Sequence, residues 1–374
     1  MTKPIEPARW TDRRILDLFG IAAPILLAPM AGAGTPELAI EVARAGGLGA
    51  LPGAMYTPDQ LHAAIAAFRA GAPGHPLNVN FFCHAPPARD PARAMGWRTR
   101  LAPYYVEMGL DPEETPPVAG RAPFDAGLCA LVEACRPEVV SFHFGLPPAD
   151  LLARVKATGA KVLSSATTVA EARWLAAHGC DAVIAQGFEA GGHRGVFLSE
   201  EIAGDMPGVI ARQVGTFALV PQVADAVDVP VIAAGGIADG RGVAAALMLG
   251  AAAVQVGTAY LFCPEAKIPA VHRAALETAG DENTALTNLF TGRPARGVVN
   301  KVMREVGPLS ADAPAFPLAG GALVPLRQKA EAAGRGDFTS LWSGQAAGLA
   351  PRLPAFELTQ QLAADALARM TRHA

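Results

Sequence analysis

The sequence predicts an α/β protein folded as a (β/α)8 barrel, the TIM-barrel class. Short apolar runs rich in Val, Ile and Ala recur along the 374 residues, and each ends in Gly, Pro, Asn or another polar residue. Most are followed by the Ala, Leu and Glu pattern of a helix. Such continuous apolar runs are typical of parallel strands buried on both faces. The eight runs are residues 25–30, 47–51, 77–82, 139–144, 161–166, 182–187, 231–236 and 253–258.

Two of the connecting segments begin with clear helix-start signals. Residues 35–45 open with Thr35, Pro36 and Glu37, which suit the N-cap, the first helical position and the first turn. Residues 168–178 open with a threonine and carry Glu171 at the third helical position. Eight strands in series with helices between them predict a closed barrel.

Two segments interrupt the simple repeat. Residues 86–136, between the third and fourth strands, form an insertion that we expect to fold as helices over one side of the barrel mouth. Residues 263–350, after the eighth strand, predict a small lobe covering the active site, and a final helix at about 354–372 would close the barrel. We therefore expect a barrel domain of residues 1–262 plus about 351–374, with the lobe appended to it.

Composition and charge argue against several classes of protein. The net charge of −3 comes with no basic run, so nucleic acid is not an expected partner. The five cysteines have no metal-ligand spacing, so we expect free thiols and no metal site. No apolar run reaches the roughly 18 residues of a membrane span, and the N-terminus has no secretory signal. We expect a cytoplasmic monomer or homodimer.

Polar residues at the strand ends predict the active site, because barrel enzymes place it at the C-terminal ends of their strands. Met30 ends the first run, Asn80 lies in the third, and Gln186 lies near the end of the sixth. Ser141 and His143 lie two residues apart in the fourth run, so they share one face of that strand. If that face points inward, both residues line the substrate pocket.

Glycine turns after the last two strands predict a phosphate site. The residues concerned are Gly235 and Gly236 after the seventh strand, and Gln255, Val256, Gly257 and Thr258 at the end of the eighth. Glycines let backbone N–H groups approach a phosphate, and a following helix start would add its dipole. The chain has no GxGxxG motif, so a phosphate monoester fits better than a pyrophosphate. We therefore expect FMN, with the amides of Asn80 and Gln186 bonded to the flavin ring.

His193 is the predicted catalytic residue. It lies between Gly192 and Arg194 on the loop after the sixth strand. Glycine allows that loop to approach a ligand, and an imidazole exchanges protons near neutral pH. Glu189 on the same loop could tune it. The other candidate histidines, His62, His178 and His272, fall in predicted helices or at their ends, where we expect them to face solvent.

The ordered set of motifs resembles the nitronate monooxygenase family, formerly called 2-nitropropane dioxygenases. Each motif alone is weak, since Gly-Gly-Ile turns occur in many phosphate-binding barrels, but the order spans nearly the whole chain. The matching segments are residues 28–32, 78–80, 141–145, 186–193, 235–237, 255–258, 290–297 and 341–345.

The resemblance implies noncovalently bound FMN and oxidation of alkyl nitronates by O2 to a carbonyl compound and nitrite. It implies that Met30, Asn80, Gln186, Gly191, Gly192, Gly235, Gly236 and residues 255–258 hold FMN, that Gln345 closes over it, and that His193 is the catalytic histidine. His193 would either hold the anionic nitronate or act as base toward a neutral nitroalkane. Both roles stay open.

Three other activities compete with this interpretation. An FMN-dependent enoyl-ACP reductase shares the histidine loop and glycine turns, and an NAD(P)H:quinone reductase could use the same barrel. Residues 141–145 and 341–345, together with the chain length, favour the monooxygenase. An FMN-free isomerase or aldolase usually needs a lysine or paired carboxylates at strand ends, and only Lys161 lies near a strand, at its wrong end.

Overall fold

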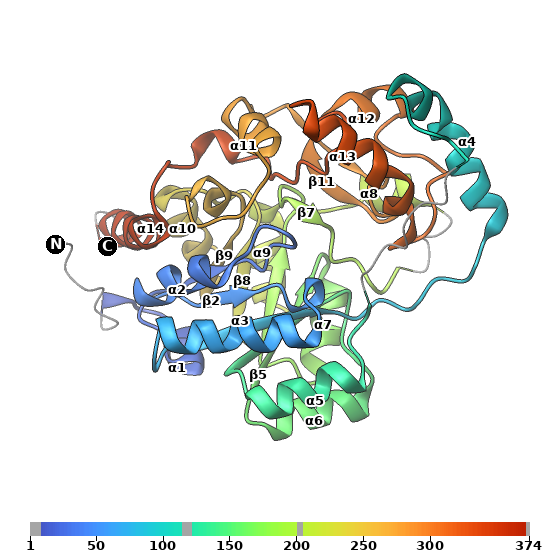
Figure 1. The fold of residues 1–374 in the computed structure, drawn as a ribbon. Helices are drawn as coiled ribbons and strands as arrows, with labels where there is room; N and C mark the ends of the chain where they lie inside the picture. Colours follow the sequence, from blue (N-terminus) through green and yellow to red (C-terminus); the bar gives the residue numbers. More distant parts are fainter. Residues whose placement is uncertain (1–8, 114–121, 200–204, 372–374) are drawn as a thin grey trace.

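Eight parallel strands form a nearly closed barrel surrounded by helices, which confirms the predicted fold class (Figure 1). The structure is a computed structural model that describes residues 9–113, 122–199 and 205–371. Around the barrel the strands run β1-β9-β8-β6-β5-β4-β3-β2, and one parallel bridge from Leu26 to Leu48 joins the two ends. The strands are β1 Ile25–Leu27, β2 Gly49–Leu51, β3 Leu77–Phe82, β4 Val139–His143, β5 Lys161–Ala166, β6 Ala182–Gln186, β8 Val231–Ala234 and β9 Ala253–Val256.

Most of the described helices cover the outside of the barrel. They are α1 Arg14–Phe19, α2 Pro36–Arg44, α3 Pro58–Gly71, α5 Ala126–Cys135, α6 Ala149–Ala157, α7 Val169–Ala177, α8 Met206–Ala211, α9 Thr216–Ala224, α10 Gly240–Met248, α11 Ala270–Glu277 and α14 Ala355–Met370, with short 3-10 turns η2 Gly53–Met55, η4 Thr258–Phe262 and η6 Ala347–Leu349. The N-cap of α2 is confirmed, because the Thr35 hydroxyl accepts a hydrogen bond from Leu38 N–H at 3.0 Å. The C-terminal helix α14 packs against α10 and α2, as expected for the closing helix.

Several strands end earlier than the sequence predicts, always at the site end of the barrel. The predicted bounds of β3 and β5 are confirmed, whereas β8 stops at Ala234, two residues short. Gly235 and Gly236 follow it with φ angles of 107° and 71°, which no strand residue adopts. The turn chemistry that makes the site therefore also terminates the strand.

The lobe contains a small antiparallel sheet that includes part of the histidine loop. Its strands are β10 Thr284–Thr287, β11 Ala295–Val298 and β7 Gly192–His193, in the order β10-β11-β7. Helices α12 Lys301–Val306 and α13 Val324–Ala332 and the turn η5 Leu318–Leu323 complete it. His193 pairs directly with Ala295 across this sheet. The histidine loop is thus joined to the barrel at its start and paired with the lobe at its centre.

The insertion after β3 packs differently from the expectation. Helix α4, Pro91–Glu107, lies beside α12 and α13 of the lobe rather than over the barrel mouth (Figure 1). Trp97 donates its indole N–H to Ala319 O at 3.0 Å, and the Tyr105 hydroxyl donates to Ala322 O at 2.6 Å. The part of the insertion at 114–121 lies outside the described residues.

The division into two domains at 262 and 351 stays a prediction.

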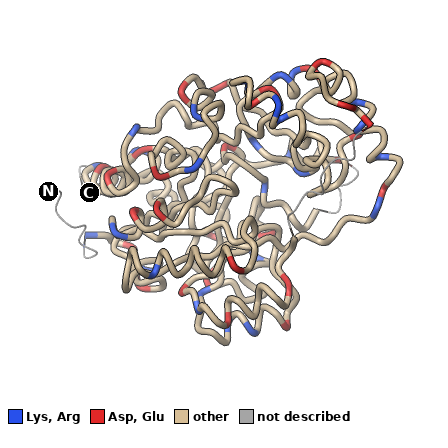
Figure 2. Tube along the Cα trace, viewed as in Figure 1, with Lys and Arg blue, Asp and Glu red and all other residues tan. Residues whose placement is uncertain are grey.

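Charge is distributed evenly along the described chain. Figure 2 shows Lys and Arg interspersed with Asp and Glu, without a long stretch of one sign. Among the described residues, no helix combines the length and the apolar character needed to cross a bilayer.

Arg194 is a charged side chain buried in the fold, with 1% of its surface exposed. Its guanidinium donates to the carbonyl oxygens of Gln186, at 2.7 Å, and Gly187, and its Nε donates to Gln213 Oε1 at 3.0 Å. Burial lowers the pKa of Arg194 to about 9. The Arg194 side chain therefore joins the histidine loop to the end of β6 by hydrogen bonds to these buried carbonyl oxygens.

We expect Arg194→Met to lower the free energy of unfolding of the apoprotein by about 3 kcal/mol or more, because it leaves buried carbonyls without a donor. Urea unfolding of the apoprotein measures this. Arg173→Met, at an exposed position of α7, is the matched control and should stay within about 0.5 kcal/mol of wild type. Equal midpoints for both variants would contradict the role assigned to Arg194.

Candidate active site

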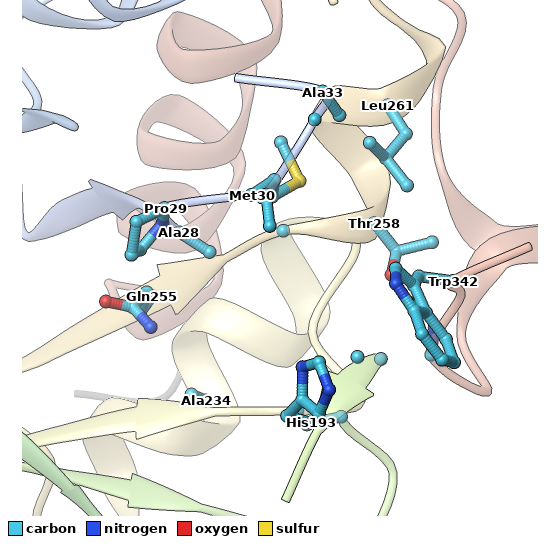
Figure 3. Close-up of a pocket in the computed structure, with 18 of the residues that line it drawn as sticks. Ala28, Pro29, Met30, Ala33, His193, Ala234, Gln255, Thr258, Leu261 and Trp342 are labelled. Carbon is cyan, nitrogen blue, oxygen red and sulfur yellow. The ribbon is translucent and has the colours of Figure 1, made fainter. Parts of the chain in front are cut away.

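A cavity of about 450 Å³ opens at the carboxyl ends of the barrel strands, where the lobe meets the barrel. Thirteen of the predicted site residues line it: Met30, Asn80, Ser141, His143, Gln186, Gly191, Gly192, His193, Gly235, Gly236, Gln255, Gly257 and Thr258. Figure 3 shows Met30, Gln255, His193 and Trp342 around one common space. The two other predicted cofactor residues, Val256 and Gln345, are not among the lining residues. Val256 is fully buried, and Gln345 N–H donates to Glu189 O at 3.0 Å.

Asn80 and Ser141 form a fixed polar pair on neighbouring strands. Asn80 Nδ2 donates to the Ser141 hydroxyl oxygen at 3.0 Å and to the Ser141 carbonyl at 3.2 Å. Both side chains are nearly buried, so this bond sets the orientation of the Asn80 amide. Because the Nδ2 atom is taken, Oδ1 is the atom that Asn80 can offer to a ligand donor. The role of Ser141 in this pair is to accept the hydrogen bonds that orient the Asn80 amide.

The main chain of His193 is fixed by two donors from the barrel. Its carbonyl oxygen accepts from Gln186 Nε2 at 2.9 Å and from His143 Nε2 at 3.3 Å. His143 Nδ1 lies 3.1 Å from the Ser165 hydroxyl, which donates to it because Nε2 already carries the proton. Burial lowers the pKa of His143 to about 4. His143 is therefore a neutral donor that positions the histidine loop.

The His193 ring is held from the lobe side and surrounded by aromatic rings. Its Nε2 lies 2.9 Å from the hydroxyl of Thr291, a buried residue of the loop between β10 and β11. Four rings lie within 6.3 Å of its centroid, namely those of Phe82, Phe144, Phe316 and Trp342. These rings limit the access of water to the imidazole.

Glycines allow three segments to meet at the predicted phosphate end. A Cβ on Gly191 would lie 2.5 Å from the backbone nitrogen of Gly344, and one on Gly235 would lie 2.9 Å from the nitrogen of Ala190. Gly344 N–H donates to the Thr258 hydroxyl at 2.9 Å, and η4 begins at Thr258. Glycine at both positions thus lets these segments pack closely together at the edge of the cavity.

The helix after the seventh barrel strand contributes less than the sequence suggests. Asp239 caps α10, accepting from Arg241 N–H at 2.9 Å and from Gly242 N–H at 3.3 Å. The first donors of α10 are therefore already used. On this side of the barrel, a phosphate would be bound by the Gly235–Gly236 turn itself and by the start of η4.

Gln255 contributes a polar atom to the cavity wall that has no partner among the described residues. Gln255 Oε1 is buried and makes no hydrogen bond to any described residue. A buried unpaired acceptor is costly, so this atom indicates a bound donor. A flavin ring has donor positions on its edge, so Gln255 and the Asn80 amide fit such a group.

The sequence missed several residues that the lobe brings to the cavity. Arg327 and Thr339 of the lobe line the cavity, and His272 joins them from α11, whereas Trp342, which also lines it, lies in the matching segment 341–345. The expectation that His272 faces solvent is wrong, because it is 6% exposed and its Nε2 donates to Trp342 O at 2.9 Å. Its position on an amphipathic helix was the available signal. His62 and His178 are exposed, as expected.

Glu189 is bonded to the start of α9, and its predicted effect on His193 stays a prediction. Its carboxylate accepts from Thr216 N–H at 2.8 and 3.0 Å and from the Thr216 hydroxyl at 2.8 Å. These bonds cap the N-terminus of α9. Glu189 thus fixes the far end of the histidine loop against the barrel.

Comparisons with known proteins agree with this geometry. Residues 12–365 match the family described as nitronate monooxygenase. A protein named nitronate monooxygenase from Pseudomonas aeruginosa is 44% identical over 94% of this chain and 98% of its own length. Another of that name, from Paraburkholderia phytofirmans, is 42% identical over 94% of each chain.

Solved structures of similar sequence share the fold of this chain. The nitroalkane oxidase of Streptomyces ansochromogenes is 38% identical with a TM-score of 0.86, over 96% of this chain and 100% of its own. FabK of Thermotoga maritima is 29% identical with a TM-score of 0.70, over 96% and 97%. The match to the family spans both the barrel and the lobe that complete the cavity, and the chain therefore belongs to the nitronate monooxygenase family of oxidoreductases.

Proposed function

We propose that this enzyme uses FMN to oxidise alkyl nitronates with O2, giving a carbonyl compound and nitrite. The observation that carries the proposal is the position of the His193 ring, which borders the same cavity as the glycine-lined phosphate end and the Gln255 amide. The relatives named nitronate monooxygenase and nitroalkane oxidase support the substrate class. A location in the cytoplasm and a monomeric or homodimeric state stay predictions.

The cavity has the properties that FMN requires. Gly191, Gly235 and Gly236 keep one end free of side chains, so a phosphate could approach backbone N–H groups there. The buried Gln255 Oε1 and the Asn80 amide would pair with polar atoms of the ring. At about 450 Å³, the space is in the range of ordinary cofactor sites.

FMN, when bound, accepts electrons from the substrate and passes them to O2. The protein supplies orientation, exclusion of water and control of one proton. The His193 imidazole would hold the oxygens of the anionic nitronate by a hydrogen bond, or take the α-proton of a neutral nitroalkane. The rings of Phe82 and Trp342 would keep water from competing for this hydrogen bond.

The choice of electron donor separates this proposal from a nicotinamide-dependent reductase. We expect the yellow enzyme to bleach rapidly when a nitronate such as propionate-3-nitronate is added without oxygen. NADPH under the same conditions should leave the flavin spectrum unchanged over the same time. Stopped-flow absorbance measures both reactions, and rapid bleaching by NADPH alone would favour an enoyl-ACP or quinone reductase.

His193→Asn should lower kcat by at least about 10²-fold while flavin content stays at the wild-type level, because the imidazole acts on the substrate and not on the fold. His62→Asn, on the exposed face of α3, is the matched control and should keep full activity. Oxygen consumption with a nitronate measures both. Turnover within twofold of wild type in His193→Asn would contradict the catalytic assignment.

Gln255→Met should weaken FMN binding by about tenfold, since one hydrogen bond to the ring is lost. The apoprotein should not lose stability, because Gln255 Oε1 has no partner within the described protein. Fluorescence titration of the apoprotein with FMN gives the affinity, and thermal unfolding gives the stability. Gln222→Met, at an exposed position of α9, is the control. An unchanged Kd in Gln255→Met would remove Gln255 from the cofactor site.

A further inference from the structure

We propose that Thr291 of the lobe is a positioning residue that holds the His193 imidazole with its neutral-state proton on Nε2. This inference rests on the role proposed for His193 and names the residue that controls its proton. Thr291 lies in the matching segment 290–297, but no role was predicted for its side chain. It does not line the cavity, and it acts only through the histidine ring.

The position of Thr291 is well defined. It is 1% exposed and lies in the loop between β10 and β11, and β11 is the lobe strand that pairs with the histidine loop. Its hydroxyl oxygen lies 2.9 Å from His193 Nε2, the shortest contact that this oxygen makes to any described residue. Its other two contacts join it to Arg293, whose carbonyl lies at 3.3 Å and whose N–H lies at 3.4 Å.

Counting donors and acceptors assigns the proton. A threonine hydroxyl donates one hydrogen bond and accepts two. If His193 Nε2 carries a proton, the Thr291 oxygen accepts from Nε2 and from Arg293 N–H, and its own proton goes to Arg293 O. All three contacts are then satisfied. If Nε2 is unprotonated, the hydroxyl must turn toward it, and Arg293 O loses its donor. The geometry thus favours the Nε2–H tautomer, in which Nδ1 is the basic atom.

The same hydrogen bond serves both protonation states of His193. In the neutral ring and in the imidazolium alike, Nε2–H can donate to the Thr291 oxygen. The hydroxyl therefore need not reorient when Nδ1 gains or loses a proton. An oxygen acceptor also stabilises the imidazolium more than the neutral ring, because hydrogen bonds to charged groups are stronger.

Gln186 and His143 of the barrel contact the backbone of His193, whereas Thr291 of the lobe contacts its ring. Gln186 and His143 hold the carbonyl oxygen, and the aromatic neighbours Phe82 and Phe144 cannot accept a hydrogen bond of similar strength. Thr291 provides a hydroxyl oxygen that accepts a hydrogen bond from the ring. The lobe would therefore set the chemistry of the histidine as well as enclosing the cavity.

Neighbouring charged groups should not obscure the titration of His193. Burial lowers the pKa of His143 to about 4 and that of Arg293 to about 10. Arg194, on the same loop, has a pKa lowered by burial to about 9, and burial also lowers the pKa of His272, behind Trp342. A pH limb near neutrality that disappears in His193→Asn can be assigned to His193.

Three variants of the holoenzyme test the proposal by kinetics. Thr291→Val removes the hydroxyl at similar volume, Thr291→Ser keeps it, and Thr287→Val makes the same change at a buried lobe position whose hydroxyl accepts only from Leu289 N–H among the described residues. Thr291→Val should lower kcat by about tenfold with little change in KM. The midpoint of the His193 limb should move to lower pH by about one pH unit. Thr291→Ser should restore both, and Thr287→Val should resemble wild type.

A spectroscopic measurement tests the tautomer without turnover. Nitrogen NMR of ¹⁵N-histidine-labelled enzyme distinguishes a protonated from an unprotonated ring nitrogen, and the signal missing in His193→Asn identifies His193. We expect Nε2–H in wild type and in Thr291→Ser at pH values where the ring is neutral, and a mixture of tautomers in Thr291→Val.

The outcomes separate this inference from the proposed function. Wild-type kcat, pH profile and tautomer in Thr291→Val would overturn it, as would equal losses in Thr291→Val and Thr287→Val. A wild-type enzyme that does not oxidise nitronates would contradict the proposed function alone, because the tautomer comparison needs no substrate.

Discussion

The antiparallel pairing of Gly192 and His193 with the lobe strand β11 is the constraint on which the site depends. A loop at the mouth of a barrel is ordinarily mobile, because few backbone hydrogen bonds fix it. Here its centre is a strand of a second sheet, and its start is tied to β6 by the buried guanidinium of Arg194. The histidine therefore has a defined position relative to the strand ends, although it belongs to no barrel strand.

The barrel itself could be predicted because each of its strands is buried on both faces. Such strands appear in the sequence as continuous apolar runs, and all eight were found. Most of the errors lie at the carboxyl ends, as where Gly235 and Gly236 adopt positive φ angles and end β8 early, whereas β2 begins two residues later than predicted. Helix α4 was harder to place, because its apolar face gives no indication of which surface it covers. Trp97 and Tyr105 pack on the lobe, more than 200 residues away in sequence.

The same reasoning explains which site residues the sequence could supply. Asn80, Ser141, His143 and Gln186 lie on barrel strands, so the geometry of parallel strands brings them together without further information. Thr291 and His272 reach the site only through the packing of the lobe. The contact from His193 to Thr291 spans 98 residues, and no spacing rule covers a contact of that kind. A polar residue buried in a lobe can be interpreted only once its neighbour is known.

Two of the histidines that line the cavity, His143 and His193, have different partners. His143 is buried, and the charge of Arg293 adds to the effect of burial in lowering its pKa to about 4. It therefore stays neutral near pH 7 and donates its single proton to the carbonyl of His193. A second imidazole that titrated in the same range would compete for the proton that we propose His193 to move. The lowered pKa thus keeps His143 out of acid–base chemistry near neutral pH, and its hydrogen bond fixes the backbone of the residue for which we propose that role.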